Sequence, residues 1–155
     1  MPSTSFLDLA AQFCKAAGSP VPELQPNENG VLAFTATVRA VDVTVTHDPA
    51  LQPGHVAMFV TFGPVPRHRQ LEVYRDLLHN NLLLVQAGAP AFSLNPFDDQ
   101  VILQYMCPLF EASGANLWAG LQGVIDGALQ WREALAQALP PDTTQGAGTV
   151  TQSFA

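Results

Sequence analysis

Charged residues are scarce in this chain of 155 residues. Only 12% of the residues are Asp, Glu, Lys or Arg, against about 25% in typical globular chains, whereas 48% are apolar. So few charges leave a surface short of solubilising groups, and we expect part of the apolar area to have a partner. Nucleic-acid binders need clustered Lys and Arg for phosphates. Six basic residues against thirteen acidic ones, with a net charge of −7, argue against that class.

Long apolar runs and targeting signals are also missing. No run approaches the roughly 18 apolar residues that a membrane span needs. The N-terminus lacks a basic leader and carries Asp8 within its apolar part, unlike a secretory signal. The two cysteines, Cys14 and Cys107, are far apart in the sequence, so we expect reduced, buried thiols in a cytoplasmic protein.

Motifs of catalysis and metal binding are absent as well. The histidines His47, His55, His68 and His79 have no metal-ligand spacing, and no HExxH, CxxC, Gly-x-Ser-x-Gly or phosphate-cradling glycine loop occurs. His47 and His55 flank one turn, where a metal or acid–base pair is conceivable, but histidines in solvent at the loop ends are favoured. We therefore expect no enzyme, no metal and no cofactor. Because catalytic groups can converge from distant positions, a small-ligand-binding or enzymatic α+β domain, with a cavity between sheet and last helix, remains the alternative.

The apolar periodicity predicts eight elements. A capping box from Ser5 to Asp8 begins a helix that Gly18 ends. Strands are predicted within residues 30–36, 39–48, 55–63, 90–96 and 100–109, and two further helices over about 68–87 and 114–139. The third strand is apolar on both faces, so it should be central or covered on both sides.

The order α-β-β-β-α-β-β-α has strand connections short enough for hairpins. It predicts an α+β fold in which three helices cover a five-stranded antiparallel sheet. Residues 1–139 are expected to form one domain, and residues 140–155, which are poor in core formers, a mobile C-terminal tail.

The helix that contains DLLHNNLLLVQAG, residues 76–88, has more apolar positions than one face holds. One stripe comprises Leu71, Tyr74, Leu78, Leu82 and Val85. A second, off that stripe, comprises Val73, Leu77 and Leu84, beside Asn80 and Asn81. The second stripe is either deeper core or an interface. We favour an isologous homodimer contact formed by Val73, Leu77, Asn80, Asn81 and Leu84, with the asparagines pairing across the two-fold axis.

Three patterns carry a resemblance to a known family. They are DLLHNNLLL, the hairpin APAFSLNPFDDQVILQYMCPLF, and the closing Trp131 to Leu135 of the last helix. In this order, from Phe6 to Leu139, the chain resembles the class I type III secretion chaperones of the CesT (Tir chaperone) kind. The resemblance implies a cytoplasmic bacterial homodimer that binds the extended N-terminal segment of a secreted virulence effector and keeps it soluble and secretion-competent. It implies no nucleotide, with the secretion ATPase as the expected downstream partner.

An extended client can bind by strand addition to a sheet edge and by apolar contacts in grooves. The first helix and first three strands offer candidate effector-binding residues, several of which the core must also need: Phe6, Leu9, Phe13, Phe34, Val43 and Phe59. A bare dimerisation module is a third possibility.

Overall fold

The computed structural model describes residues 5–84, 89–111 and 113–137. The predicted tail, residues 140–155, and Val85, from the first apolar stripe of the helix predicted over 68–87, lie outside these residues. The elements are α1 (Phe6–Ala17), β1 (Leu32–Val38), β2 (Val41–His47), β3 (His55–Gly63), a 3-10 turn (Arg67–Arg69), α2 (Gln70–Leu83), β4 (Ala91–Leu94), β5 (Val101–Pro108) and α3 (Gly114–Gln137). The predicted order of helices and strands is confirmed.

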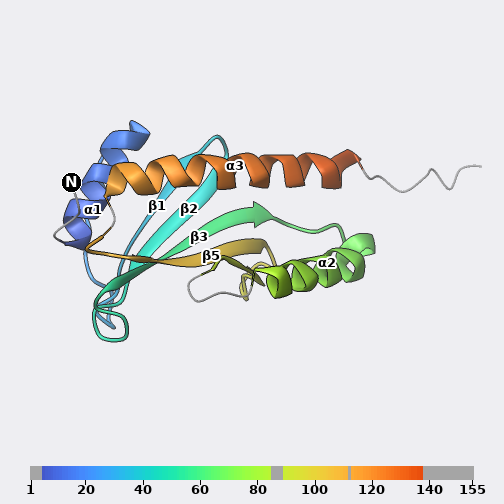
Figure 1. The fold of residues 1–155 in the computed structure, drawn as a ribbon, viewed down its shortest axis with the longest axis horizontal. Helices are drawn as coiled ribbons and strands as arrows, with labels where there is room; N and C mark the ends of the chain where they lie inside the picture. Colours follow the sequence, from blue (N-terminus) through green and yellow to red (C-terminus); the bar gives the residue numbers. More distant parts are fainter. Residues whose placement is uncertain (1–4, 85–88, 112, 138–155) are drawn as a thin grey trace, which may run out of the picture.

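The five strands form one antiparallel sheet in the order β1-β2-β3-β5-β4. The three tight connections β1–β2, β2–β3 and β4–β5 join neighbouring strands, whereas α2 lies in the connection between β3 and β4 (Figure 1). β3 lies in the middle, between β2 and β5, so its predicted central place is confirmed.

Helix α1 begins where the capping box predicts. The Ser5 hydroxyl accepts a hydrogen bond from the Asp8 backbone N–H at 3.1 Å, and Gly18 ends the helix with φ +67°. α1 packs against the start of α3 so closely that a Cβ at Gly114 would collide with the backbone of Phe13. The Gln12 side chain accepts a hydrogen bond from the Gly114 N–H at 3.1 Å.

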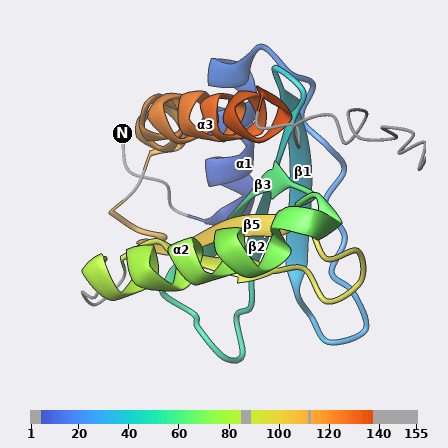
Figure 2. The same ribbon diagram turned by 90° about the vertical axis from the view of Figure 1, so that its right-hand side faces the viewer.

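The core lies between one face of the sheet and the two helices α1 and α3, which meet at the start of α3, at the left in Figure 1. Alternate residues of each long strand point into it, as period two requires. The core members contributed by β2 and β3 are Val41, Val43, Val45, Val56, Met58, Val60 and Phe62. Figure 2 shows α2 apart from this pair, at the β4 and β5 side of the sheet.

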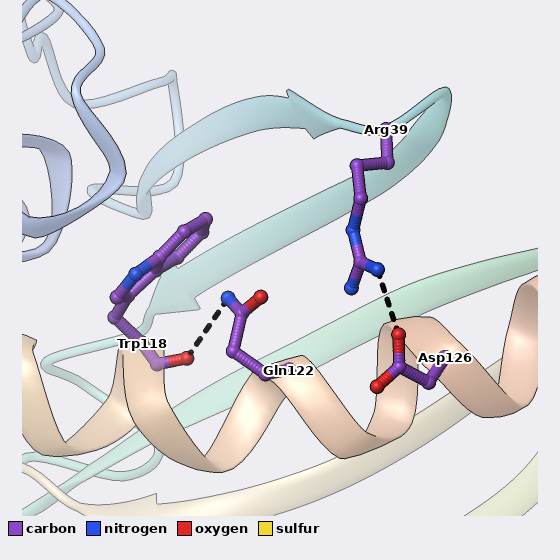
Figure 3. A network of polar contacts seen from close by, with 4 residues as sticks. All are labelled: Arg39, Trp118, Gln122 and Asp126. Carbon is purple, nitrogen blue, oxygen red and sulfur yellow. Dashed lines mark hydrogen bonds and ion pairs between the residues drawn. The ribbon is translucent and has the colours of Figure 1, made fainter.

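Polar contacts hold α3 across the far end of the sheet. The Arg132 guanidinium donates to the backbone carbonyls of Phe62 and Ala40, both at 2.6 Å, and Thr61, at 2.8 Å. Earlier on α3, Asp126 forms an ion pair with Arg39 of the β1–β2 turn at 2.7 Å (Figure 3). α3 therefore fixes the β1–β2 turn and the end of β3 relative to each other.

Candidate interaction surfaces

In α2 the second apolar stripe supplies the buried residues, and most of the first stripe is exposed. Val73 and Leu77, expected at an interface, are 6% and 8% exposed and belong to the core. In the first stripe, Leu71, Leu78 and Leu82 are 86%, 67% and 72% exposed. The correction has a physical reason: the second stripe packs toward β4 and borders a hollow shared with α3, and helical spacing alone does not say which stripe meets a neighbour.

Asn81 is used within the chain. Its side-chain amide donates to the Phe92 carbonyl at 2.9 Å and accepts from the Phe92 N–H at 2.7 Å. The amide thus forms with the backbone of β4, an edge strand of the sheet, the two hydrogen bonds that a neighbouring strand would form. The Asn81 amide is therefore engaged within the chain, and the predicted pairing across a two-fold axis would have to use its second N–H and the second lone pair of its oxygen. Asn80 and Leu84, the other members of the predicted interface, are exposed.

Five of the six candidate effector-binding residues are core residues. Phe6, Leu9, Phe13, Phe34 and Val43 are all 5% exposed or less. The cause is the packing of α1 between β1 and α3, which encloses its apolar side chains. These five side chains have no accessible face in the free protein. Phe59 is different: it is half-buried, and it lies on the opposite face of β3 from Met58 and Val60.

The face of the sheet that carries Phe59 is open. The β1 and β2 part of this face is polar, with the Thr35 and Thr44 hydroxyls 2.8 Å apart and the Thr37 hydroxyl donating to Asp42 at 2.6 Å. Toward the middle it becomes apolar, with four half-buried side chains: Ala57, Phe59, Ile102 and Met106. β1 has a strand neighbour only on its β2 side, so its outer edge is unpaired within the described part of the chain.

A hollow of about 390 Å³ lies between α2 and β4. Its lining is almost wholly apolar and comprises Tyr74, Leu77, Leu78, Asn81, Phe92, Ser93 and Leu94. The exposed Leu78 and Leu94 flank it, so the hollow continues the exposed stripe of α2 toward the edge of the sheet.

The polar side chains give no sign of a catalytic centre in the described residues. Within them, no group of three or more His, Cys, Asp or Glu could hold a metal ion. His47 is buried, and its Nδ1 lies 2.9 Å from the carbonyl of His55, so it is not the solvent histidine that the sequence favoured, whereas His55 is exposed. Burial raises the pKa of the Cys14 and Cys107 thiols, which form no disulfide.

The electrostatics of α2 are those of an exposed helix end. Arg69 and Glu72 form an ion pair at 3.0 Å. The hydrogen bond from Arg69 holds the pKa of the Glu72 carboxyl below its ordinary value, and the charge of Arg69 adds to the effect.

Among the helices that the structure describes, none has the length and apolarity needed to cross a membrane.

The fold and these surfaces agree with one protein family. The model of the Tir chaperone protein (CesT) family matches residues 8–132, and the chain belongs to this family. A search of curated proteins gives no significant match.

Solved structures share the fold at low sequence identity. A chain of the ExsC-ExsE complex is 16% identical with a TM-score of 0.64, and the match covers 83% of this chain and 92% of that one. A chain of the HopA1-SchA chaperone-effector complex is 19% identical with a TM-score of 0.55, covering 81% and 91%. A chain of the ExoT-SpcS complex from Pseudomonas aeruginosa is 17% identical with a TM-score of 0.52, covering 81% and 95%. At such identities these likenesses establish the fold.

Proposed function

We propose that this protein is a cytoplasmic type III secretion chaperone that binds the extended N-terminal segment of an effector and catalyses no reaction. Family membership over residues 8–132 carries the proposal. The similar fold of a chain in the HopA1-SchA complex, which is described as a chaperone-effector complex, supports it. The secretion ATPase is the expected downstream partner, as the family resemblance implies.

The open sheet face and the unpaired edge of β1 suit an extended client. A segment that is disordered when free loses conformational entropy on binding, so it needs a large contact area. Strand addition to β1 would supply backbone hydrogen bonds, and apolar side chains of the client would cover the half-buried strip. In the strip, Phe59 lies opposite Gln104 and diagonal to Ile102 and Met106, so these three apolar side chains form one contact surface. We place the client contact there rather than on the five buried residues.

Co-expression with the protein of the neighbouring open reading frame tests the proposal. The N-terminal segment of a co-purifying client is then titrated into the chaperone in a calorimeter. Phe59→Thr keeps a strand-forming residue and should weaken binding by at least about 10-fold, because an aromatic contact is lost. Leu51→Ser, in the exposed β2–β3 turn, is the matched control and should leave the affinity unchanged. Deletion of the client's N-terminal segment should abolish binding.

Two results would contradict this function. One is a client that binds equally well without its N-terminal segment. The other is the turnover of a small substrate at a site that mutation can locate, which would favour the enzymatic alternative.

The proposed chaperone is a homodimer that associates through the outer face of α2, rather than through Val73 and Leu77. Leu71, Leu78 and Leu82 support this, because burying each is worth roughly 1.5–3 kcal/mol and an isologous contact buries them in both copies. Light scattering at micromolar concentration should give about twice 16.6 kDa. Leu78→Asp should give a folded monomer with an unchanged circular dichroism spectrum. A monodisperse wild-type monomer would overturn the homodimer.

A further inference from the structure

The turn between β4 and β5 presents an aromatic side chain to solvent. Phe97 is 95% exposed, more than any other large apolar side chain in the described residues. The turn around it is well hydrogen-bonded: the Asn95 N–H donates to the Gln100 carbonyl at 2.8 Å, and the Asp99 N–H to the Asn95 carbonyl at 2.9 Å. The Asn95 side chain also accepts from the Phe97 N–H at 3.0 Å. Phe97 is therefore held outward by an ordered turn, although exposure of a phenylalanine gains nothing in the free chain.

Carboxylates accompany this aromatic ring. Asp98 accepts hydrogen bonds from the backbone N–H and the side-chain amide of Gln100, at 3.1 and 3.0 Å, so it helps to hold the turn. Asp99 is exposed, and its φ of +56° is a left-handed conformation that Asp tolerates better than most residues. The surface that receives Phe97 should therefore combine apolar groups with a positive charge.

Three of the six basic residues, Lys15, Arg67 and Arg75, make no ion pair among the described residues. The two ion pairs of the described residues use Arg39 and Arg69, and Arg132 is bound to backbone carbonyls. Of the remaining arginines, both Arg67 and Arg75 are exposed and make no ion pair among the described residues. Arg75 lies on α2, one turn from Leu71 and one turn from Leu78.

The outer face of α2 has two different flanks. Leu71, Leu78 and Leu82 fall within roughly 40° of one another at 3.6 residues per turn, so they form one line. On one flank is the hollow that contains Leu78 and Leu94, beyond which the chain enters the Phe97 turn. On the other flank is a hollow of about 440 Å³ in which Leu71 and Arg75 lie with Glu72, Asp76 and His79.

We infer that the Phe97 turn of one copy docks on the α2 of a second copy, beside Leu71 and Leu78, with Asp99 facing Arg75. The inference rests on the proposed homodimer and names the contact that completes it. When the two-fold axis is parallel to α2, the flank of α2 nearest the Phe97 turn in one copy faces the flank that carries Arg75 in the other copy. The same contact therefore forms twice in the dimer. Each chain carries both halves of the contact. One half is the exposed ring of Phe97 with the Asp99 carboxylate, and the other is the line of leucines on α2 with Arg75.

Truncation of the aromatic ring tests the apolar part of the contact. Sedimentation at concentrations from nanomolar to micromolar gives the dimer dissociation constant of wild type, Phe97→Ala and Phe110→Ala. Phe110 is an exposed phenylalanine beyond the opposite end of β5, and it serves as the matched control. Phe97→Ala should raise the dissociation constant by at least about 30-fold, because buried aromatic anchors dominate interfaces. Phe110→Ala should leave it unchanged, and both variants should keep the wild-type melting curve when monomeric.

Charge reversal tests the pairing independently. Asp99→Arg and Arg75→Asp should each weaken the dimer by about 10-fold, and the double variant should recover to within about 3-fold of wild type. A wild-type dimer that is indifferent to Phe97→Ala, or whose charge-reversed double variant does not recover, overturns this contact and leaves the homodimer standing. A wild-type monomer at all concentrations overturns the homodimer and the contact with it.

Discussion

Helices α1 and α2 have similar lengths, 12 and 14 residues, and each carries apolar side chains at spacings of three and four. α1 buries its whole stripe, because α3 and the sheet enclose it on that side. α2 buries only Val73 and Leu77 and leaves a line of leucines in solvent. The difference shows that an apolar stripe marks a surface to be covered but does not say whether the chain itself covers it. In α1 the stripe stabilises the fold, and in α2 we assign it to association.

The largest effect should follow a truncation in α1. Phe13 is fully buried and its ring packs edge-on against Trp118 of α3, with centroids 5.7 Å apart. Phe13→Ala leaves a cavity there and should lower the free energy of unfolding by about 3–5 kcal/mol, measured by urea denaturation at fixed protein concentration. A loss below about 1 kcal/mol would show that α1 does not enclose the core as the structure has it.

An intermediate effect is expected at the contact between α2 and the sheet. Asn81→Ala removes both hydrogen bonds to the Phe92 backbone and leaves partly buried polar groups of β4 unpaired. The free energy of unfolding should fall by about 1–3 kcal/mol. Hydrogen exchange should show the Phe92 amide losing protection, whereas amides of β2 keep theirs. Asn80→Ala, at the exposed neighbouring position, is the control and should change neither measurement.

The smallest effect on folding should come from the outer face of α2. Leu82→Ala removes a side chain that is 72% exposed, so the unfolding free energy of the monomer should change by less than about 0.5 kcal/mol. The dimer should nevertheless dissociate at higher concentration, which light scattering over a dilution series would detect. A large loss of monomer stability would contradict the contrast between the two helices, since it would give Leu82 a role in the core.

Several features of the fold were predictable because their causes are local. The capping box at Ser5, the turn formers from Asn95 to Asp99 and the alternation of Val41, Val43 and Val45 each act within a few residues, and each element appears where it was predicted. The central place of β3 followed from its two apolar faces. The candidate sites were harder to predict from the sequence. Five of the proposed effector contacts are core residues, and only their burial in the structure distinguishes a core residue from a binding residue.

The sequence by itself determined the kinds of elements, their order and the family, since hydrophobic periodicity, caps and turns are encoded by neighbours along the chain. It also contained the excess of apolar over charged residues that calls for a partner. Only the tertiary structure decided which stripe of α2 faces the core, that Asn81 pairs with β4, and that the surface of Phe59 stays open. These three features depend on contacts between segments that are far apart in the sequence. The spacing of a side chain on its own helix or strand does not indicate which distant segment it will contact.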